Sequence, residues 1–283
     1  MITVLKSGIH CSIQDRGRFG FRHLGVPISG CMDESSANAA NLILNNHLND
    51  AVLEIGLIGP ELEFNDDTLI CISGATKKVT LNQKPVQFYK RIKVTAGDVL
   101  SFKSGASGVW TYMAIKNGVQ SSKVLGSRST YLKADIGFDL IKGSKIQFIP
   151  FTDIDEVKTF SRLSFSITSK VIKVNRGPEW HLLNEEQQVL LLSKPFLIRS
   201  QSDRMGYYLD SDAKKSLSHN QSILTSPVNA GTLQLPPSGI PIVLMKDAQT
   251  TGGYPRVLQV VHSDLSLLSQ KRAGEEVRFE MLN

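Results

Sequence analysis

Three segments of the sequence combine charged or amide side chains with glycines in otherwise apolar surroundings. They cover residues 14–33, 199–207 and 246–256. Glycine lets backbone N–H groups approach a ligand, and arginine offers a planar fork that binds a carboxylate or phosphate through two hydrogen bonds. A neighbouring aspartate can orient the guanidinium or accept a proton. These residue types predict a site for a small polar substrate.

The third segment gives the clearest indication of ligand binding. It follows a very apolar predicted strand, residues 240–245, and contains two threonines, two glycines and a proline within residues 249–256. Such a loop is typical of a ligand site carried by a rigid scaffold. In the other two segments the alternative stays open that the Asp15–Arg18 and Asp203–Arg204 pairs are structural salt bridges that hold turns.

The charge distribution favours a small anionic substrate over nucleic acid. The chain has 283 residues with 32 Lys and Arg against 26 Asp and Glu, a formal net charge of +6. These positive charges are scattered singly, without a Lys/Arg block or interleaved aromatic residues, so we expect no nucleic-acid binding.

The apolar pattern and the cysteines indicate a cytoplasmic protein. Apolar runs stay far below the ~18 residues that span a bilayer, and the N-terminus lacks the pattern of a signal peptide, so we expect no membrane association. The three cysteines form neither a disulfide framework nor a CxxC pair. We expect Cys31 and Cys71 to be small buried apolar side chains.

The sequence lacks several familiar catalytic motifs. It contains no P-loop, no dinucleotide-binding fingerprint, no GxSxG and no HExxH, and its six histidines do not occur at ligand spacing. We therefore expect no tightly bound catalytic metal. Met245-Lys246 is followed by Asp247 where a biotinylated hairpin would have a second methionine, so we expect no covalently bound biotin.

The elements that must position these segments are mainly short strands. Helices are predicted only over residues 32–44, with Asp33 as its N-cap, over residues 184–192 and over residues 263–270. The remaining apolar stretches are short and separated by turn residues, a pattern typical of β-barrels or β-sandwiches.

Internal repeats indicate a duplication. The matching pairs, in conserved order, are Ile2–Gly8 with Ile172–Gly177, Arg18–Phe21 with Arg204–Tyr207, Leu53–Pro60 with Leu233–Pro241, and Ala96–Phe102 with Ala273–Phe279. A polar stretch over residues 150–169 lies between the two copies. We therefore predict two similar domains, residues 1–158 and 159–283.

Several of these stretches together make a resemblance specific. Residues 14–18, 25–33, 127–132, 199–206, 231–237 and 247–256 resemble the family of 5-oxoprolinase C subunits, also called the KipI antagonist or allophanate hydrolase subunit 2 group. The family is similar to part of the carboxyltransferase region of urea carboxylase. The resemblance extends from Gly8 to Phe279. It departs at Cys31, where a small residue such as alanine is usual, and at Leu44-Asn45-Asn46, which replaces a turn richer in glycine.

The resemblance implies a fold, partners and a reaction. The fold is mainly β, with two similar cyclophilin-like β-barrel domains and a few short helices. The partners are the B and A subunits of 5-oxoprolinase. Together the three proteins open 5-oxo-L-proline to L-glutamate at the expense of ATP, by phosphorylation of the lactam. The alternatives are a carboxyltransferase module of a biotin-dependent carboxylase and a non-enzymatic antagonist of a kinase inhibitor.

The reaction implied by the resemblance assigns roles to the polar residues. Arg204 or Arg256 would bind the substrate carboxylate or stabilise the transferring phosphoryl group, and Asp203 or Asp247 would orient an arginine or help to hold Mg²⁺ with ATP. Gln249 and Thr250 would hydrogen-bond the lactam. The other expected substrate-binding residues are Thr251, Gly252 and Arg199 from the second half, with Gln14 and Arg18 contributed by the first half.

Overall fold

The chain forms two compact units, which are described separately. The computed structural model describes residues 1–137, 139–152 and 168–282. The described part of the first unit has residues 1–18, 29–137 and 139–152, and that of the second has 19–28 and 168–282. The predicted domain boundary, between residues 158 and 159, lies outside the described residues. The short segment Phe19–Ile28 belongs to the second unit although the chain on either side of it belongs to the first.

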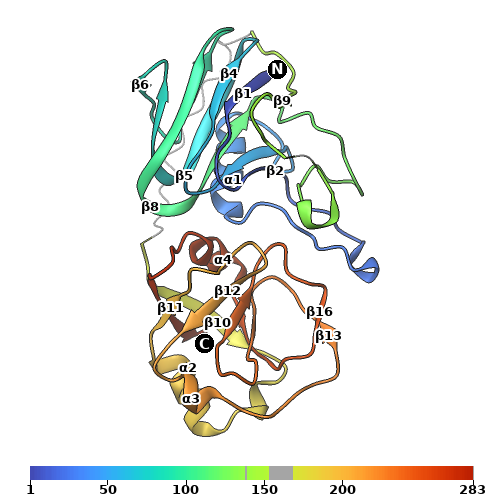
Figure 1. Cartoon of the computed structure of the whole chain (residues 1–283), viewed down its shortest axis with the longest axis vertical. Coiled ribbons are helices and arrows are strands. Elements are labelled where there is room, and N and C mark those ends of the chain that lie inside the picture. Colours follow the sequence, from blue (N-terminus) through green and yellow to red (C-terminus); the bar gives the residue numbers. More distant parts are fainter. Residues whose placement is uncertain (138, 153–167, 283) are drawn as a thin grey trace. The chain divides into compact units, whose positions relative to one another are not determined.

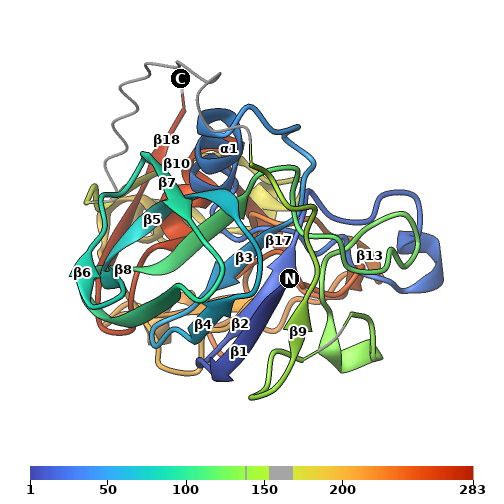
Figure 2. The ribbon, with the colours of Figure 1, turned by 90° about the horizontal axis from the view of Figure 1, so that it is seen from above.

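The first unit is built on one curled sheet of nine strands. Five of them follow the order β2-β3-β8-β4-β1, β9 continues this order at β1, and β5 joins β8 to β6 and β7. The strands are β1 (Ile2–Lys6), β2 (Cys11–Gln14), β3 (Val52–Ile55), β4 (Glu61–Phe64), β5 (Thr68–Leu81), β6 (Lys84–Pro85), β7 (Arg91–Val94), β8 (Val99–Ile115) and β9 (Lys145–Ile146). Figure 2 shows this sheet curving from β6 to β9. Its inward apolar side chains, among them Ile2, Phe64 and Met113, form the core of the unit.

A helix covers part of this sheet. Helix α1 (Glu34–Ile43) packs against β5 and β8, and a short 3-10 helix η2 (Leu132–Ala134) lies further along the chain. The side chain of Asp33 accepts a hydrogen bond from the backbone N–H of Ser36 at 3.0 Å, so the predicted N-cap is confirmed. The alanines of α1 are small enough for its backbone to lie close to the sheet.

The second unit is a closed barrel of seven strands in the order β10-β17-β14-β15-β12-β11-β18. These strands are β10 (Val171–Arg176), β11 (Phe196–Ile198), β12 (Gly206–Asp210), β14 (Thr232–Gln234), β15 (Ile242–Leu244), β17 (Arg256–Val260) and β18 (Glu276–Met281). A separate pair, β13 (Ser226–Pro227) and β16 (Thr251–Gly252), lies outside the barrel sheet. The helices are η1 (Arg22–Leu24), η3 (Trp180–Leu182), α2 (Glu185–Ser193), α3 (Lys214–Leu217) and α4 (His262–Ser269). Figure 1 labels several of these elements, among them β10, β11, β12 and helices α2, α3 and α4.

The mainly β prediction is confirmed, and so are the three predicted helices, each to within two residues. Two long strands differ from the prediction. The sequence indicates separate strands over residues 69–72 and 78–81, and over 99–102 and 110–115, but each pair is one continuous strand, β5 or β8. The glycines between them lie where the β5–β8 register shifts, between Gly74 and Lys78, and not in turns. A glycine that bends a strand cannot be distinguished by type from one that ends it.

One pair of repeated segments has the same local structure in both units. The turns Thr95–Asp98 and Arg272–Glu275 lead into β8 and β18, and in each the third residue is a glycine with positive φ, 90° and 83°. In each turn the first N–H donates to the carboxylate of the last residue, at 2.8 and 3.2 Å. This shared geometry supports the duplication.

Within the residues that the structure describes, no helix is both long and apolar enough to cross a bilayer.

Candidate functional site

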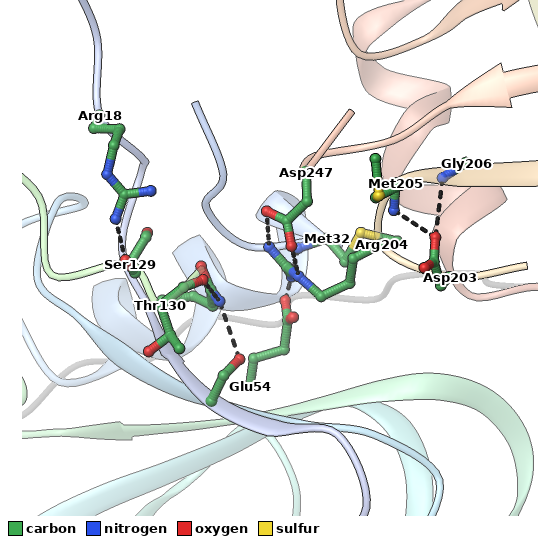
Figure 3. Close-up of polar contacts among 12 residues, drawn as sticks. Arg18, Met32, Glu54, Ser129, Thr130, Asp203, Arg204, Met205, Gly206 and Asp247 are labelled. Carbon is green, nitrogen blue, oxygen red and sulfur yellow. Dashed lines mark hydrogen bonds and ion pairs between the residues drawn. The ribbon is translucent and has the colours of Figure 1, made fainter. Parts of the chain in front are cut away.

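The second and third polar segments meet in the second unit at an ion pair. Arg204 lies two residues before strand β12, and Asp247 lies three residues after strand β15. These strands are antiparallel neighbours, with Gly206 opposite Leu244, so the turn before one lies beside the loop after the other. The Arg204 Nε and Nη2 atoms lie 2.6 and 3.0 Å from the two Asp247 carboxylate oxygens (Figure 3). The Asp247 N–H also donates to the Arg204 carbonyl at 2.8 Å.

This pair is largely shielded from water, since the Arg204 and Asp247 side chains are 15% and 9% exposed. A two-pronged, charge-assisted contact of this kind holds a guanidinium in one orientation. Asp203 has a different task, because its carboxylate accepts the N–H groups of Met205 and Gly206 at 2.7 and 3.3 Å. Asp203 thus shapes the turn, while Asp247 orients Arg204. Catalytic roles for these three residues stay a prediction.

Arg256 is held by a carboxylate that the sequence pattern did not indicate. Its Nε and Nη2 atoms donate to the two oxygens of Glu179 at 2.8 and 2.7 Å, and its backbone N–H donates to the same carboxylate at 3.0 Å. Its Nη1 reaches the Pro227 carbonyl at 2.9 Å. Glu179 follows a Gly-Pro turn, but its partner lies 77 residues away, so sequence spacing offers no signal for the pair.

The Glu179–Arg256 pair is expected to make the stability of the second unit depend on pH. Hydrogen bonds from Arg256 hold the pKa of the Glu179 carboxyl below its ordinary value, despite the opposing effect of burial. A lowered pKa stabilises the fold above the unfolded-state pKa, about 4.3 for glutamate, and this stabilisation is lost as pH falls through the lower folded-state pKa. We expect Glu179→Gln to lower the melting temperature at pH 7 and to flatten its decline between about pH 5 and 3.

Thermal melts against pH measure this effect. Glu280→Gln, at an exposed residue of β18, serves as a control and should leave the melting profile unchanged. Identical profiles for Glu179→Gln and the wild type would show that the pair contributes nothing to stability.

The amide residues of the third segment gather around a second residue that was not predicted. Gln234 in β14 is 1% exposed, and its Oε1 accepts a hydrogen bond from Gln249 Nε2 at 3.3 Å. Gly252 packs directly on it, since a Cβ at that position would lie 2.4 Å from Gln234 Nε2. The sequence feature that could have identified Gln234 is an amide side chain between two apolar residues, Leu233 and Leu235. Gln249 and Gly252 therefore both contact this buried amide, and their contacts with substrate stay a prediction.

The other predicted residues of this unit lie outside its barrel strands. Thr251 is exposed, and the Thr250 carbonyl accepts the N–H of Val228 at 3.1 Å. Arg199, in the turn after β11, has Asp210 as its ion-pair partner at 3.6 Å within the described part of the chain, and both side chains are partly exposed. Its guanidinium is thus less constrained than that of Arg204.

The first polar segment belongs to a buried network in the first unit. Gln14 is fully buried, and its Nε2 donates to Ser12 Oγ and to the Thr130 carbonyl at 3.0 and 3.1 Å. Arg18 is 1% exposed and donates to the Ser129 carbonyl (Figure 3). These contacts attach residues 127–130 to β2 and its extension. Substrate contacts by Gln14 and Arg18 stay a prediction.

Asp15 completes this network. Its carboxylate accepts the hydroxyls of Ser127 and Ser129 at 2.6 and 2.7 Å and the N–H of Arg128 at 2.7 Å. The Gly17 N–H also donates to Asp15 at 2.8 Å, so this buried carboxylate is satisfied by several hydrogen-bond donors.

The first unit also contains a buried glutamate, Glu54, that was not among the predicted site residues. Glu54 is fully buried in β3 and accepts hydrogen bonds from the Met32 N–H at 2.7 Å and the Tyr112 hydroxyl at 2.8 Å. Burial, together with the nearby negative charge of Glu54, raises the pKa of Tyr112 well above its ordinary value. The hydroxyl therefore stays protonated and can donate to Glu54. The signal was a glutamate between two apolar residues, Leu53 and Ile55.

The cysteines and the acidic residues offer no reactive or metal-binding cluster of their own. Cys31 and Cys71 are buried as expected, and burial raises the pKa of Cys71 to about 12, so its thiol stays protonated. In the described ranges, no three His, Cys, Asp or Glu residues are placed to hold a metal ion. Asp203 and Asp247, the residues expected to help hold Mg²⁺, already accept hydrogen bonds from this chain. A role for either carboxylate in holding Mg²⁺ stays a prediction.

Comparisons with known proteins agree with this fold. The family model "carboxyltransferase domain, subdomain A and B" matches residues 24–281. The C subunit of the Haemophilus influenzae 5-oxoprolinase is 34% identical over 100% of this chain and 92% of its own length. The solved structure of TTHA0988 has a TM-score of 0.87 at 28% identity and covers 99% of this chain, which spans 55% of that one. The Kluyveromyces lactis urea carboxylase has a TM-score of 0.88 at 26% identity, covering 100% of this chain and 27% of its own. By its sequence along the full length and by its fold, this chain belongs to the family of 5-oxoprolinase C subunits.

Proposed function

We propose that this chain is the C subunit of an ATP-hydrolysing 5-oxoprolinase, which with its A and B subunits opens 5-oxo-L-proline to L-glutamate. The observation that carries the proposal is the 34% identity with the C subunit of the Haemophilus influenzae 5-oxoprolinase over nearly the full length of both chains. The polar loop of the second unit supports it, because its residue types suit a small amide that carries a negative charge.

The chemistry of the substrate explains why such a loop is useful. A lactam is an amide and resists attack by water, whereas phosphorylation of its carbonyl oxygen creates a leaving group and an electrophilic carbon. The reacting amide has one acceptor and one donor. The Gln249 amide, positioned by the buried Gln234, and the Thr250 hydroxyl can supply a matching donor and acceptor. Arg204, held by Asp247, is oriented to bind the substrate carboxylate or to stabilise the transferring phosphoryl charge.

The nucleotide and its Mg²⁺ are assigned to the complex and not to this chain alone. The described residues lack a metal-binding cluster and the sequence lacks a P-loop. The solved relative TTHA0988 is nearly twice as long as this chain. Its additional length supports the proposal that a partner protein completes the site of this chain. We propose that the B subunit joins this chain in binding and phosphorylating 5-oxoproline, and that the A subunit hydrolyses the activated ring.

The test is reconstitution of the complete complex. The chain is co-expressed with the A and B homologues, and ATP turnover and glutamate formation are measured with and without 5-oxo-L-proline. We expect oxoproline-dependent turnover only when all three proteins are present. Full turnover by the A and B homologues in the absence of this chain would refute the proposal.

A second candidate follows from the fold. The likeness to the Kluyveromyces lactis urea carboxylase and the carboxyltransferase family model favour carboxyl transfer from carboxybiotin on another protein. Transfer of the carboxyl group from a carboxybiotin carrier to urea, without oxoproline-dependent ATP turnover, would support this alternative.

Gln249 gives a graded test of substrate binding. Gln249→Ala removes one hydrogen bond to an uncharged group of the substrate, worth about 0.5–1.5 kcal/mol, so we expect KM for 5-oxoproline to rise about 3–10-fold. It also removes the donor to the buried Gln234 oxygen, so we expect the melting temperature to fall slightly. Gln87→Ala, at an exposed glutamine of the first unit, is the matched control. An unchanged KM in Gln249→Ala would exclude the residue from the substrate site.

A further inference from the structure

Arg22 lies in the segment Phe19–Ile28, which comes from the N-terminal part of the sequence but belongs to the second unit. Its guanidinium donates to the side-chain oxygen of Asn229 and to the carbonyls of Val228 and Thr250, the last at 2.9 Å. Thr250 lies in the loop that the proposed function assigns to the substrate, and Val228 follows β13. Arg22 therefore joins this loop to the segment beside it from a point 206 or more residues away in the sequence.

The substrate loop has little support of its own. Strands β13 and β16 have two residues each, with Ser226 opposite Gly252 and Pro227 opposite Thr251. Proline has no N–H to donate, and a two-stranded ribbon is marginally stable by itself. Contacts from outside the ribbon must supply the rest of its order.

Two arginines supply such contacts. Arg256, fixed by Glu179, reaches the Pro227 carbonyl at 2.9 Å. Arg22 reaches the next carbonyl along the chain, that of Val228, and also the Thr250 carbonyl in the opposite segment. The Thr250 carbonyl, near the start of the loop, also accepts the Val228 N–H at 3.1 Å. Arg22 therefore supplies a second hydrogen bond to this carbonyl.

The pairing of Arg22 differs from that of the other arginines of this site. Arg204 and Arg256 are each paired with a carboxylate, whereas Arg22, among the described residues, contacts only neutral oxygens. Three acceptors in different directions use the fork of a guanidinium, which a lysine ammonium cannot reproduce. Its contacts thus match the requirements of holding a backbone in place.

We propose that Arg22 is a positioning residue, which holds the Gln249–Gly252 loop in the conformation that binds the substrate. The segment Phe19–Ile28 thereby completes the candidate site of the second unit. The kinetic part of this inference rests on the proposed oxoprolinase function, but the structural part does not.

Hydrogen exchange tests the structural part on the isolated full-length chain. In Arg22→Ala we expect peptides that cover residues 223–229 and 249–254 to exchange at least 10-fold faster, with unchanged exchange in the barrel strands and a melting temperature close to that of the wild type. Arg22→Lys keeps the charge and should show an intermediate increase. Arg278→Ala, which removes an exposed arginine of β18, is the charge-matched control and should leave these peptides unchanged.

Kinetics in the reconstituted complex test the functional part. We expect KM for 5-oxoproline to rise at least 10-fold in Arg22→Ala, with kcat within about twofold, and Arg22→Lys to recover part of the loss. Unchanged exchange in the loop, or a uniform increase over the whole unit with a large fall in melting temperature, would overturn the positioning role. Faster local exchange with an unchanged KM in an active complex would also overturn it. If the wild-type complex shows no oxoproline-dependent turnover, the proposed function fails, while local exchange still decides whether Arg22 holds the loop.

Discussion

Replacing Arg204 by alanine is expected to lower kcat/KM for 5-oxoproline about 10–100-fold in the assembled complex. This corresponds to a charge-assisted contact of about 1.5–3 kcal/mol. The change also leaves the largely buried carboxylate of Asp247 without its guanidinium, which should destabilise the second unit by about 3 kcal/mol. Steady-state kinetics and thermal melts of the same preparations separate the two effects.

The matching change in the first unit should give the opposite balance. Arg18 is 1% exposed and donates to the Ser129 carbonyl, so Arg18→Ala should cost more stability and less activity than Arg204→Ala. A double-mutant cycle that combines Arg204→Ala with Asp247→Ala tests whether these two side chains act as a pair. If they do, the double variant should lose less stability and activity than the two single variants lose in sum. Full activity in Arg204→Ala and Arg256→Ala, with loss only in Arg18→Ala, would place the site in the first unit.

A large loss of stability is expected from substitution of Gly177, a glycine outside the candidate site. Gly177 follows β10, and a Cβ at this position would lie 2.0 Å from the Arg256 carbonyl oxygen and 2.7 Å from its carbonyl carbon. Both are backbone atoms of β17, so the clash can be relieved only by moving the strand that carries Arg256. We expect Gly177→Ala to destabilise the second unit by about 3 kcal/mol or more, and to disturb the Glu179–Arg256 pair.

Gly274→Ala provides the comparison for this prediction. Gly274 has a positive φ of 83° but open space around its Cβ position, so its cost is limited to backbone strain of about 1–2 kcal/mol. Chemical denaturation of both variants and the wild type measures the difference. Equal destabilisation by the two substitutions would show that the close approach of Gly177 to β17 carries no particular cost.

Local patterns determined much of the architecture. The sequence predicted the mainly β class, the three longer helices and the Asp33 cap, because hydrophobic periodicity and capping depend on residues a few positions apart. It also indicated the polar segments from which the candidate site is proposed. The short helix α3 was not predicted, since four residues are too few for a periodic signal.

Contacts between residues far apart in the sequence decided which partner each polar side chain of the candidate site has. Arg204 and Asp247 are 43 residues apart, Arg256 and Glu179 are 77 apart, and Arg22 reaches Thr250 across 228 residues. The buried amide of Gln234 and the buried acid Glu54 appear in the sequence only as single polar residues within apolar strands. Strand register and barrel closure bring such residues together, and neither can be deduced from local spacing.

The sequence by itself determined the family, the β-rich class and the polar segments, since these follow from residue types and local order. The tertiary structure alone decided which carboxylate holds each arginine, that β5 and β8 are continuous, and that Phe19–Ile28 belongs to the second unit. The physical reason is that a buried charge or amide is stabilised only by the particular donors and acceptors that surround it in space. Those neighbours are chosen when the strands pair and the barrel closes.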